Sequence, residues 1–315
     1  MKGSWLLLAL GLSSIAVQAE RGPTERGPTE RGPTERGPTE RGPTESAFTS
    51  PGGRLLATGG ATMIEGAAGG GLVPWAVLAG YGTREEWGGD VFATRVQTAD
   101  YRLDTAGLNY SYANRIELSL ARQRLDISTL SKAAGLPKSS LNQDIVGAKV
   151  RLFGDLVYDQ LPQVALGMQY KRQTNFAIPE AVGARRDSDT EAYLAASRLV
   201  LGGAFGYNLL VNGTLRYSRA NETGLLGFGG DRRDARSLLK EGSVAVLLSP
   251  QWVLGVEYRE KPDNLSFAGE SDWQDVFVGY FPDKRLALVA AWADLGEIAT
   301  LDNQTGVYLS MQLSY

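Results

Sequence analysis

The sequence predicts an all-β fold, a transmembrane antiparallel β-barrel of about fourteen strands, with twelve strands as the alternative. Segments of about ten residues alternate apolar and polar side chains, so each predicted strand has one apolar and one polar face. Short connections alternate with long polar ones along the chain, as in outer-membrane barrels. The last segment, TGVYLSMQLSY, keeps this alternation up to Tyr315. We therefore expect the final strand to close the barrel by pairing with the first.

The N-terminal region is predicted to lie outside the barrel. Met1 and Lys2 precede the apolar run WLLLALGL and a stretch of small residues that ends at Ala19, which indicates a cleaved secretory signal peptide over residues 1–19. Residues 20–50 contain five copies of RGPTE, whose lack of apolar side chains predicts a disordered periplasmic linker of open role. Residues 51–315 are then the barrel.

The predicted strands are counted back from Tyr315. They lie near 304–315, 285–294, 272–281, 251–260, 241–248, 207–219, 190–201, 163–174, 144–154, 115–127, 102–112, 90–98, 72–82 and 54–64. Twelve strands result if the pair within 90–112 does not form. The short connections fall at one end of the barrel, and the long ones, near 128–143, 175–189, 220–239, 261–271 and 295–303, fall at the other.

Aromatic side chains mark the ends of the apolar rows. Tyr207 and Tyr217 lie ten residues apart on one face. That spacing is about 33 Å along a strand and projects, with the usual tilt, to about 25 Å, the height of the apolar band of outer-membrane barrels. The predicted membrane-interface aromatics are Tyr207, Tyr217, Trp252, Tyr258, Tyr280, Trp292 and Tyr315.

The opposite faces of the strands carry charges, which favours a membrane barrel with a polar lumen over a soluble β-sandwich. The predicted pore-lining residues are Lys149, Arg151, Lys171, Arg198, Arg216, Glu257, Arg259, Glu117 and Asp275. Two arginines do not fit, because Arg122 and Arg124 continue the outward phase of their strand. Either they lie at the outer rim, where lipid phosphates can pair with them, or a bulge reverses the phase.

Composition limits the chemistry that the chain can perform. The sequence has no His and no Cys, and neither a carboxylate pair nor a Ser-Lys arrangement stands out, so no enzymatic activity is predicted. No cofactor and no metal site is predicted. The formal net charge of -3 is nearly balanced, so nucleic acid is not an expected partner.

Four segments carry a resemblance to a known family: EGAAGGGLVPWAVLAGYGTRE (65–85), RIELSLARQRLD (115–126), GLLGFGGDRRD (224–234) and KPDNLSFAGESDWQDVFVGYFPDK (261–284). Together they resemble an uncharacterised proteobacterial family of outer-membrane-type β-barrel proteins, a domain of unknown function. The resemblance covers roughly residues 54–315. It implies the barrel fold and supplies neither a substrate nor a mechanism.

These observations predict a porin-like channel in the outer membrane of a Gram-negative bacterium, which passes small solutes by diffusion with a mild preference for anions. Asp231, Arg232, Arg233 and Asp234 are predicted to line a constriction in a long loop. The expected partners are outer-membrane lipid and lipopolysaccharide, small solutes, and the barrel-insertion machinery, which would read the C-terminal strand. The alternatives are a fourteen-strand transporter of hydrophobic compounds, plugged by residues 46–71, and a non-transporting structural or adhesive barrel. The solute and the oligomeric state stay open.

Overall fold

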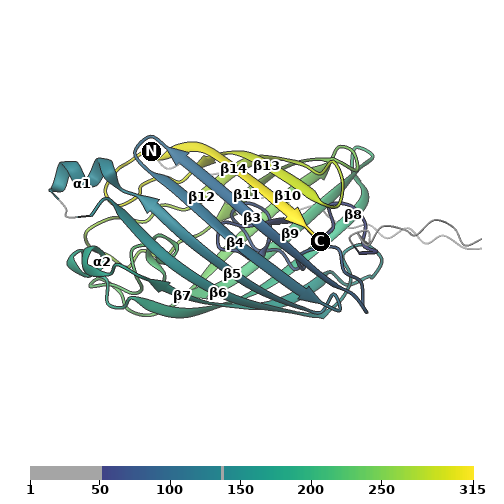
Figure 1. Ribbon diagram of the computed structural model, residues 1–315, viewed down its shortest axis with the longest axis horizontal. Helices are drawn as coiled ribbons and strands as arrows, with labels where there is room; N and C mark the ends of the chain where they lie inside the picture. The colour runs from purple at the N-terminus through teal and green to yellow at the C-terminus, as the bar shows by residue number, and fades with distance from the viewer. Residues whose placement is uncertain (1–51, 136–137) are drawn as a thin grey trace, which may run out of the picture. The chain divides into compact units, whose positions relative to one another are not determined.

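The computed structural model describes residues 52–315 apart from 136–137, so the predicted signal peptide and RGPTE linker lie outside the described residues. Within this part of the chain, twelve antiparallel strands close into one barrel, as Figure 1 shows. The strands are β3 (Trp87–Thr98), β4 (Arg102–Tyr112), β5 (Ile116–Asp126), β6 (Ser140–Phe153), β7 (Gln163–Gln173), β8 (Ser188–Ala204), β9 (Tyr207–Ser218), β10 (Ser237–Leu247), β11 (Trp252–Arg259), β12 (Trp273–Tyr280), β13 (Leu286–Asp294) and β14 (Thr305–Ser314).

The barrel closes between its last and first strands. β14 pairs with β3 in a register that sets Val307 opposite Gln97 and Leu313 opposite Val91. Beyond β14, Tyr315 and Gly89 exchange two backbone hydrogen bonds of 2.9 and 3.0 Å. The prediction that the last strand closes the barrel onto the first is therefore confirmed.

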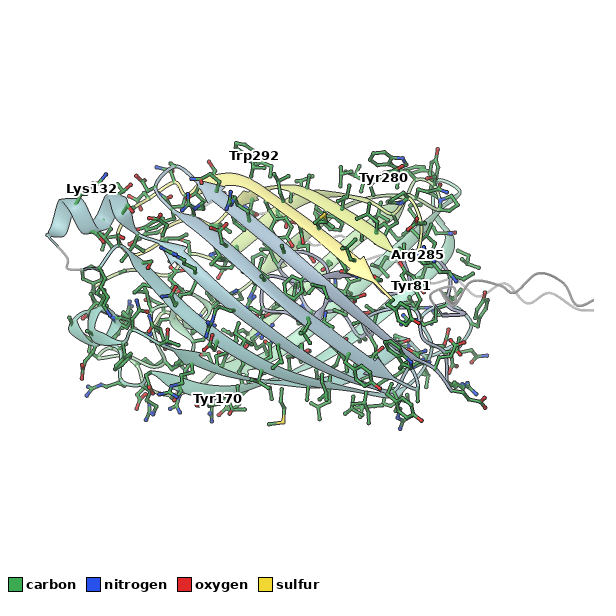
Figure 2. All side chains as sticks on the ribbon, in the orientation of Figure 1. Tyr81, Lys132, Tyr170, Tyr280, Arg285 and Trp292 are labelled. Atoms are coloured by element: carbon green, nitrogen blue, oxygen red, sulfur yellow. The ribbon has the colours of Figure 1, made fainter. Side chains whose placement is uncertain are left out.

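The apolar faces of the strands point away from the barrel interior. On β9, Val211 and Leu215 are 42% and 45% exposed, whereas Asn212, Thr214 and Arg216, which alternate with them, are buried. All seven predicted interface aromatics lie on this outward face. Figure 2 shows Tyr170 and Trp292 projecting outward toward the long-loop end and Tyr280 toward the short-turn end. An apolar outer band flanked by aromatic residues is the surface that a membrane-spanning barrel presents to lipid.

Arg122 and Arg124 stay in the outward phase, and no bulge reverses it. The pairing of β5 with β6 runs without interruption from Ile116 to Asp126. Arg122 instead forms an ion pair of 2.6 Å with Asp144 on the neighbouring strand. Both arginines lie toward the long-loop end of β5, where a charge on the lipid-facing surface costs about 0–1 kcal/mol rather than the larger cost at mid-depth.

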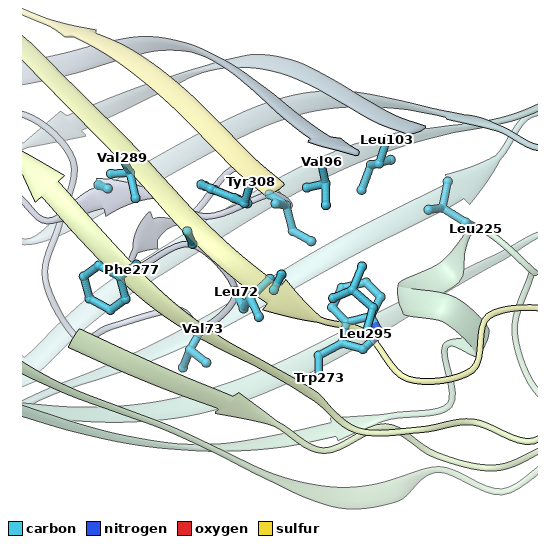
Figure 3. Packing of buried hydrophobic residues seen from close by; sticks show 14 of the residues in the cluster. Leu72, Val73, Val96, Leu103, Leu225, Trp273, Phe277, Val289, Leu295 and Tyr308 are labelled. Atoms are coloured by element: carbon cyan, nitrogen blue, oxygen red, sulfur yellow. The ribbon is translucent and has the colours of Figure 1, made fainter. Parts of the chain in front are cut away.

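The predicted strands at 54–64 and 72–82 are wrong as barrel strands, which leaves twelve. The pair within 90–112, on which the alternative of twelve depended, does form, as β3 and β4. Residues 60–81, called the inner segment below, lie inside the barrel, and every one of them is buried. The segment contains only two short strands, β1 (Ala61–Thr62) and β2 (Ala68–Gly69), which pair with each other. The sequence LVPWAVLAGY has no alternation and contains Pro74, which cannot donate to a strand ladder. Figure 3 shows Leu72 and Val73 packed among wall side chains such as Tyr308 and Phe277.

The helices lie in the long loops. α1 (Ser128–Ala134) follows β5, α2 (Ala177–Ala181) follows β7, and the short 3-10 turn η1 (Asn221–Gly224) follows β9. In the described part of the chain, each helix is too short or too polar to cross a membrane. The loop after β9 folds inward, because residues 220–230 are all buried, and it covers the long-loop end of the interior.

Candidate functional site in the barrel interior

A buried carboxylate on the inner segment meets three basic side chains of the barrel wall. Glu65 is fully buried, and its carboxylate lies 2.5 Å from Lys171 Nζ. Arg259 Nη2 donates to both Glu65 oxygens, at 2.9 and 3.0 Å. Arg216 Nη1 lies 3.6 Å from the same carboxylate. β7, β9 and β11 thus each contribute one cation to a single anion of the inner segment.

Two further wall carboxylates complete this cluster. Glu191 pairs with Lys171 at 2.7 Å and with Arg216, and Glu241 lies 2.5 Å from Arg216 Nε. Three basic side chains therefore face three carboxylates, one of which, Glu65, belongs to the inner segment. Buried charges persist only when they are paired and hydrogen-bonded. Removal of Glu65 would leave the wall residues with one unbalanced positive charge.

A second set of contacts holds the remainder of the inner segment. Lys149 Nζ donates to the carbonyl oxygens of Ala68 and Val77, at 2.8 and 2.9 Å. Glu117, 3.3 Å from that ammonium group, accepts hydrogen bonds from the backbone N–H groups of Ala68 and Ala79. The ion pair between β5 and β6 thus provides both donors and acceptors for a segment that lacks a regular sheet partner.

Glu257 on β11 supports the turn that follows β2. Its Oε2 accepts from the backbone N–H groups of Gly71 and Leu72, at 2.6 and 2.7 Å. A Cβ atom at Gly70 would lie 2.0 Å from Glu257 Oε1, so a larger residue would displace this hydrogen-bonded carboxylate from the turn. The glycine run GGG at 69–71 therefore serves a close contact with the wall rather than a membrane-spanning strand.

The structure brings most of the predicted pore-lining residues together on the inward face, where they meet the inner segment and not open water. Those buried in the interior are Glu117, Lys149, Lys171, Arg216, Glu257, Arg259 and Asp275. Arg151 lies at the short-turn end, where it donates to Gly154 O and pairs with Asp155 at 3.1 Å. Arg198 is a correction: it shares the outward phase of Leu194 and Val200, and its guanidinium group donates to Gln160 O in the turn after β6.

Three residues of the cluster were not predicted from sequence. Glu191 and Glu241 carry a signal that could have found them, because both lie in the inward phase of predicted strands. Glu65 carries no such signal. It lies within residues 46–71, which the transporter alternative places in the barrel as a plug, but nothing in the sequence pairs it with the basic residues of the wall.

The predicted loop constriction is also corrected. Asp231, Arg232, Arg233 and Asp234 are exposed, and they connect neighbouring loops instead of lining the interior. Asp231 accepts hydrogen bonds from Ser266, Arg232 pairs with Asp263, and Asp234 pairs with Arg186. The part of this loop that does close the interior is 220–230, whose Thr223 carbonyl accepts from Lys171 Nζ at 3.2 Å.

A buried charge cluster holds the loops at the long-loop end. Lys261 Nζ lies 2.8 Å from Glu222 and 3.1 Å from Glu270, and Glu222 N donates to Glu270 Oε1 at 2.8 Å. Burial raises the pKa of Glu222 to about 8, and the nearby Glu270 carboxylate adds to this effect. The Lys261 ammonium group thus forms ion pairs with two carboxyl groups. A proton on Glu222 relieves the repulsion between the Glu222 and Glu270 carboxylates.

This cluster predicts a pH-dependent loop arrangement. Because the Glu222 pKa is raised from 4.5 to about 8, the closed loops bind more protons than open loops do, and their stability falls as the pH rises between these values. Hydrogen exchange of residues 221–226, corrected for its intrinsic pH dependence, should show stronger protection near pH 5 than above pH 8. Glu222→Gln should flatten this dependence. Protection that grows with pH would contradict the assignment.

The architecture defines the class of the protein: twelve tilted antiparallel strands, an apolar outer band with aromatic residues, and a polar inner face make it an outer-membrane β-barrel. The chain belongs to the family described as "Protein of unknown function (DUF3034)", whose model matches residues 58–312. The family match includes the inner segment, the first eleven barrel strands and β14 up to Gln312. A comparison with curated proteins finds no match.

Solved structures with a similar fold are distant in sequence. The KdgM porin is 12% identical over 72% of this chain and 99% of its own, with a TM-score of 0.46. The outer membrane protein Omp33 of Acinetobacter baumannii is 9% identical over 74% of this chain and 100% of its own, also with a TM-score of 0.46.

One comparison corrects the prediction that the chain is not an enzyme. The outer membrane phospholipase A of Escherichia coli is 11% identical over 72% of this chain and 92% of its own, with a TM-score of 0.38. The barrels that resemble this chain thus include an enzyme. The prediction that the chain has no enzymatic activity, which was drawn from the missing His and Cys, is therefore corrected.

Proposed function

We propose that the protein is an outer-membrane channel through which small solutes diffuse passively when the inner segment leaves the lumen. The observation that supports this proposal is the polar character of the contacts between the inner segment and the wall. Glu65, Ala68, Gly71 and Ala76 are all held by wall side chains through ion pairs or hydrogen bonds. Water can replace such contacts, and the wall that remains is polar and can line a solute path.

The selectivity of this path follows from the charges that the inner segment leaves behind. With Glu65 withdrawn, Lys171, Arg216 and Arg259 face only two carboxylates, Glu191 and Glu241. This ring of five side chains then carries an excess positive charge and favours anions. The inward carboxylates Asp90, Glu257 and Asp275 outnumber this excess, so a mild anion preference requires that the ring, and not the wall as a whole, sets the selectivity.

Planar bilayers test the proposal. The purified full-length barrel should show a mostly closed state with infrequent openings, and the reversal potential of the open state in a salt gradient should indicate a mild anion preference. Arg216→Glu, which reverses one charge of the ring, should shift the reversal potential toward cations. A barrel that never conducts, with the inner segment present or released, would contradict the channel, and a cation-selective open state would contradict only the selectivity.

The same preparation separates the two alternatives. Liposomes that contain the protein should swell in small sugars and anions if it is a channel. Uptake restricted to alkyl compounds would indicate the transporter of hydrophobic compounds, for which the inner segment would serve as the N-terminal plug. The absence of any uptake would leave the structural or adhesive barrel, whose loops would carry the function.

A further inference from the structure

The interior changes character at the short-turn end. On β9 the inward side chains run from Arg216, Thr214 and Asn212 to Leu210, and on β12 they run from Asp275 to Phe277. Leu199 and Val253, on β8 and β11, also point inward at this level and are buried. A lumen that only passed polar solutes would not require an apolar collar here, since apolar walls interact poorly with water.

The described side chains do not fill this collar. A cavity of about 440 Å³ lies between the wall and the inner segment, bounded by Leu56, Trp75 and Val77 on the inner side and by Leu210, Val253 and Phe277 on the wall. Protein interiors contain few voids larger than a water molecule. The volume falls within the roughly 300–1,000 Å³ that is typical of small-molecule sites, which are also mostly apolar.

The residues at the rim of the cavity indicate where a ligand enters and which chemical group its polar end carries. Leu55, Leu201 and Tyr207 line the rim and are 57%, 60% and 49% exposed, and Leu201 and Tyr207 lie beside the β8–β9 turn on the outer surface of the barrel. Thr58, Asn208 and Ser249, with the hydroxyl groups of Tyr158 and Tyr207, provide polar groups in the lining, and none of the lining residues in the described chain is charged. An apolar cavity with an apolar rim and an uncharged lining suits a molecule that partitions into lipid and carries no charge.

We propose that this cavity binds an uncharged, single-chain amphiphile, with its alkyl chain between Trp75 and the wall and a hydroxyl-type head at the rim. The site requires the inner segment in place, since Trp75 and Val77 form one of its sides. It is therefore a property of the closed barrel, and it stands whether or not solutes pass through the lumen.

Photolabelling tests the site. The full-length protein in phospholipid liposomes is irradiated with dodecanol that carries a diazirine, and the labelled peptides are mapped by mass spectrometry. Outward residues will be labelled from the bilayer in every case. The informative label is on the peptide that contains Trp75 and Val77, because the barrel wall separates these side chains from lipid. We expect this peptide to be labelled and the label to be lost when unmodified dodecanol competes.

Two variants provide matched controls. Leu210→Trp places a larger side chain in the cavity and should abolish the label on the inner segment, whereas Leu215→Trp, on the outward face of the same strand, should retain it. Heat-modifiable migration on gels verifies that both barrels are folded, and competition in the wild type serves as the test if Leu210→Trp does not fold. Label on outward peptides alone would overturn the proposal, as would equal labelling by a diazirine-bearing hexose. Cross-links that show Ala47 and Phe48 in the cavity would also overturn it.

Discussion

Replacing Glu65 with Gln should convert a mostly closed barrel into a conducting one. The substitution keeps the size of the side chain but removes the only anion that the inner segment contributes to the cluster with Lys171, Arg216 and Arg259. Breaking a buried ion pair from one side costs about 3–5 kcal/mol. If that cost is borne by the closed state, the open fraction should rise by about a hundredfold or more, since each 1.4 kcal/mol is a factor of ten.

The measurement is the open probability in planar bilayers, compared with that of the wild type. Glu85→Gln is the matched control, because Glu85 is exposed and lies just outside the inner segment. It should leave the open probability unchanged. If Glu65→Gln conducts no more than the wild type while the barrel remains folded, the cluster does not hold the lumen closed.

Replacing Val244 with Arg should destabilise the inserted barrel by about 2–4 kcal/mol, the cost of an arginine on the lipid-facing surface at the bilayer midplane. Val244 is 44% exposed in the middle of β10, between Val211 on β9 and Val256 on β11. Leu238→Arg, on the same face of the same strand but six residues nearer the long loops, should cost only about 0–1 kcal/mol.

Denaturant unfolding from lipid vesicles measures both variants against the wild type. Leu238 is more exposed, at 61%, than Val244, at 44%. A larger loss of stability at Val244 therefore reflects its depth in the membrane and not its exposure. Equal losses at Val244 and Leu238 would contradict a membrane position for the outward band. A larger loss at Leu238 would invert the expected depth profile.

The barrel wall could be predicted from sequence because lipid and lumen impose a period of two on every strand. Tyr207 to Tyr217 illustrate this: the apolar phase and the polar phase were both assigned correctly, including Leu210 as the inward exception. Arg122 and Arg124 could not be resolved in the same way, since the outward phase and a bulge were both consistent with the residues. The ion pair of Arg122 with Asp144 depends on the register of β5 with β6, which a single strand does not reveal.

The sequence anticipates the inner segment only in part, as the plug at 46–71 that one alternative requires, because a buried segment inside a barrel has no periodic solvent or lipid face. Leu72 and Val77 are buried on all sides, and their apolar character resembles that of a strand, which is why 72–82 was predicted as one. For the same reason the sequence predicts that the charged side chains of the lumen face water and have no partner on an inner segment. Lys171 was correctly placed on the inward face, but its partner Glu65 is more than one hundred residues away in the sequence. The phase of Arg198 is ambiguous in the sequence because both faces of β8 carry apolar side chains, such as Leu199 inward and Val200 outward.

The most direct test of the account is a reversible cross-link that pins the inner segment to the wall of the conducting Glu65→Gln variant. Ala76→Cys and Ser197→Cys suit this purpose, since Ala76 N donates to Ser197 Oγ at 2.8 Å and the native sequence has no other cysteine. If solutes pass only when the inner segment moves, the channels should be closed in the oxidised protein and should conduct after reduction. Equal conductance in the two states, with the disulfide verified by mass spectrometry, would show that solutes do not need the inner segment to move.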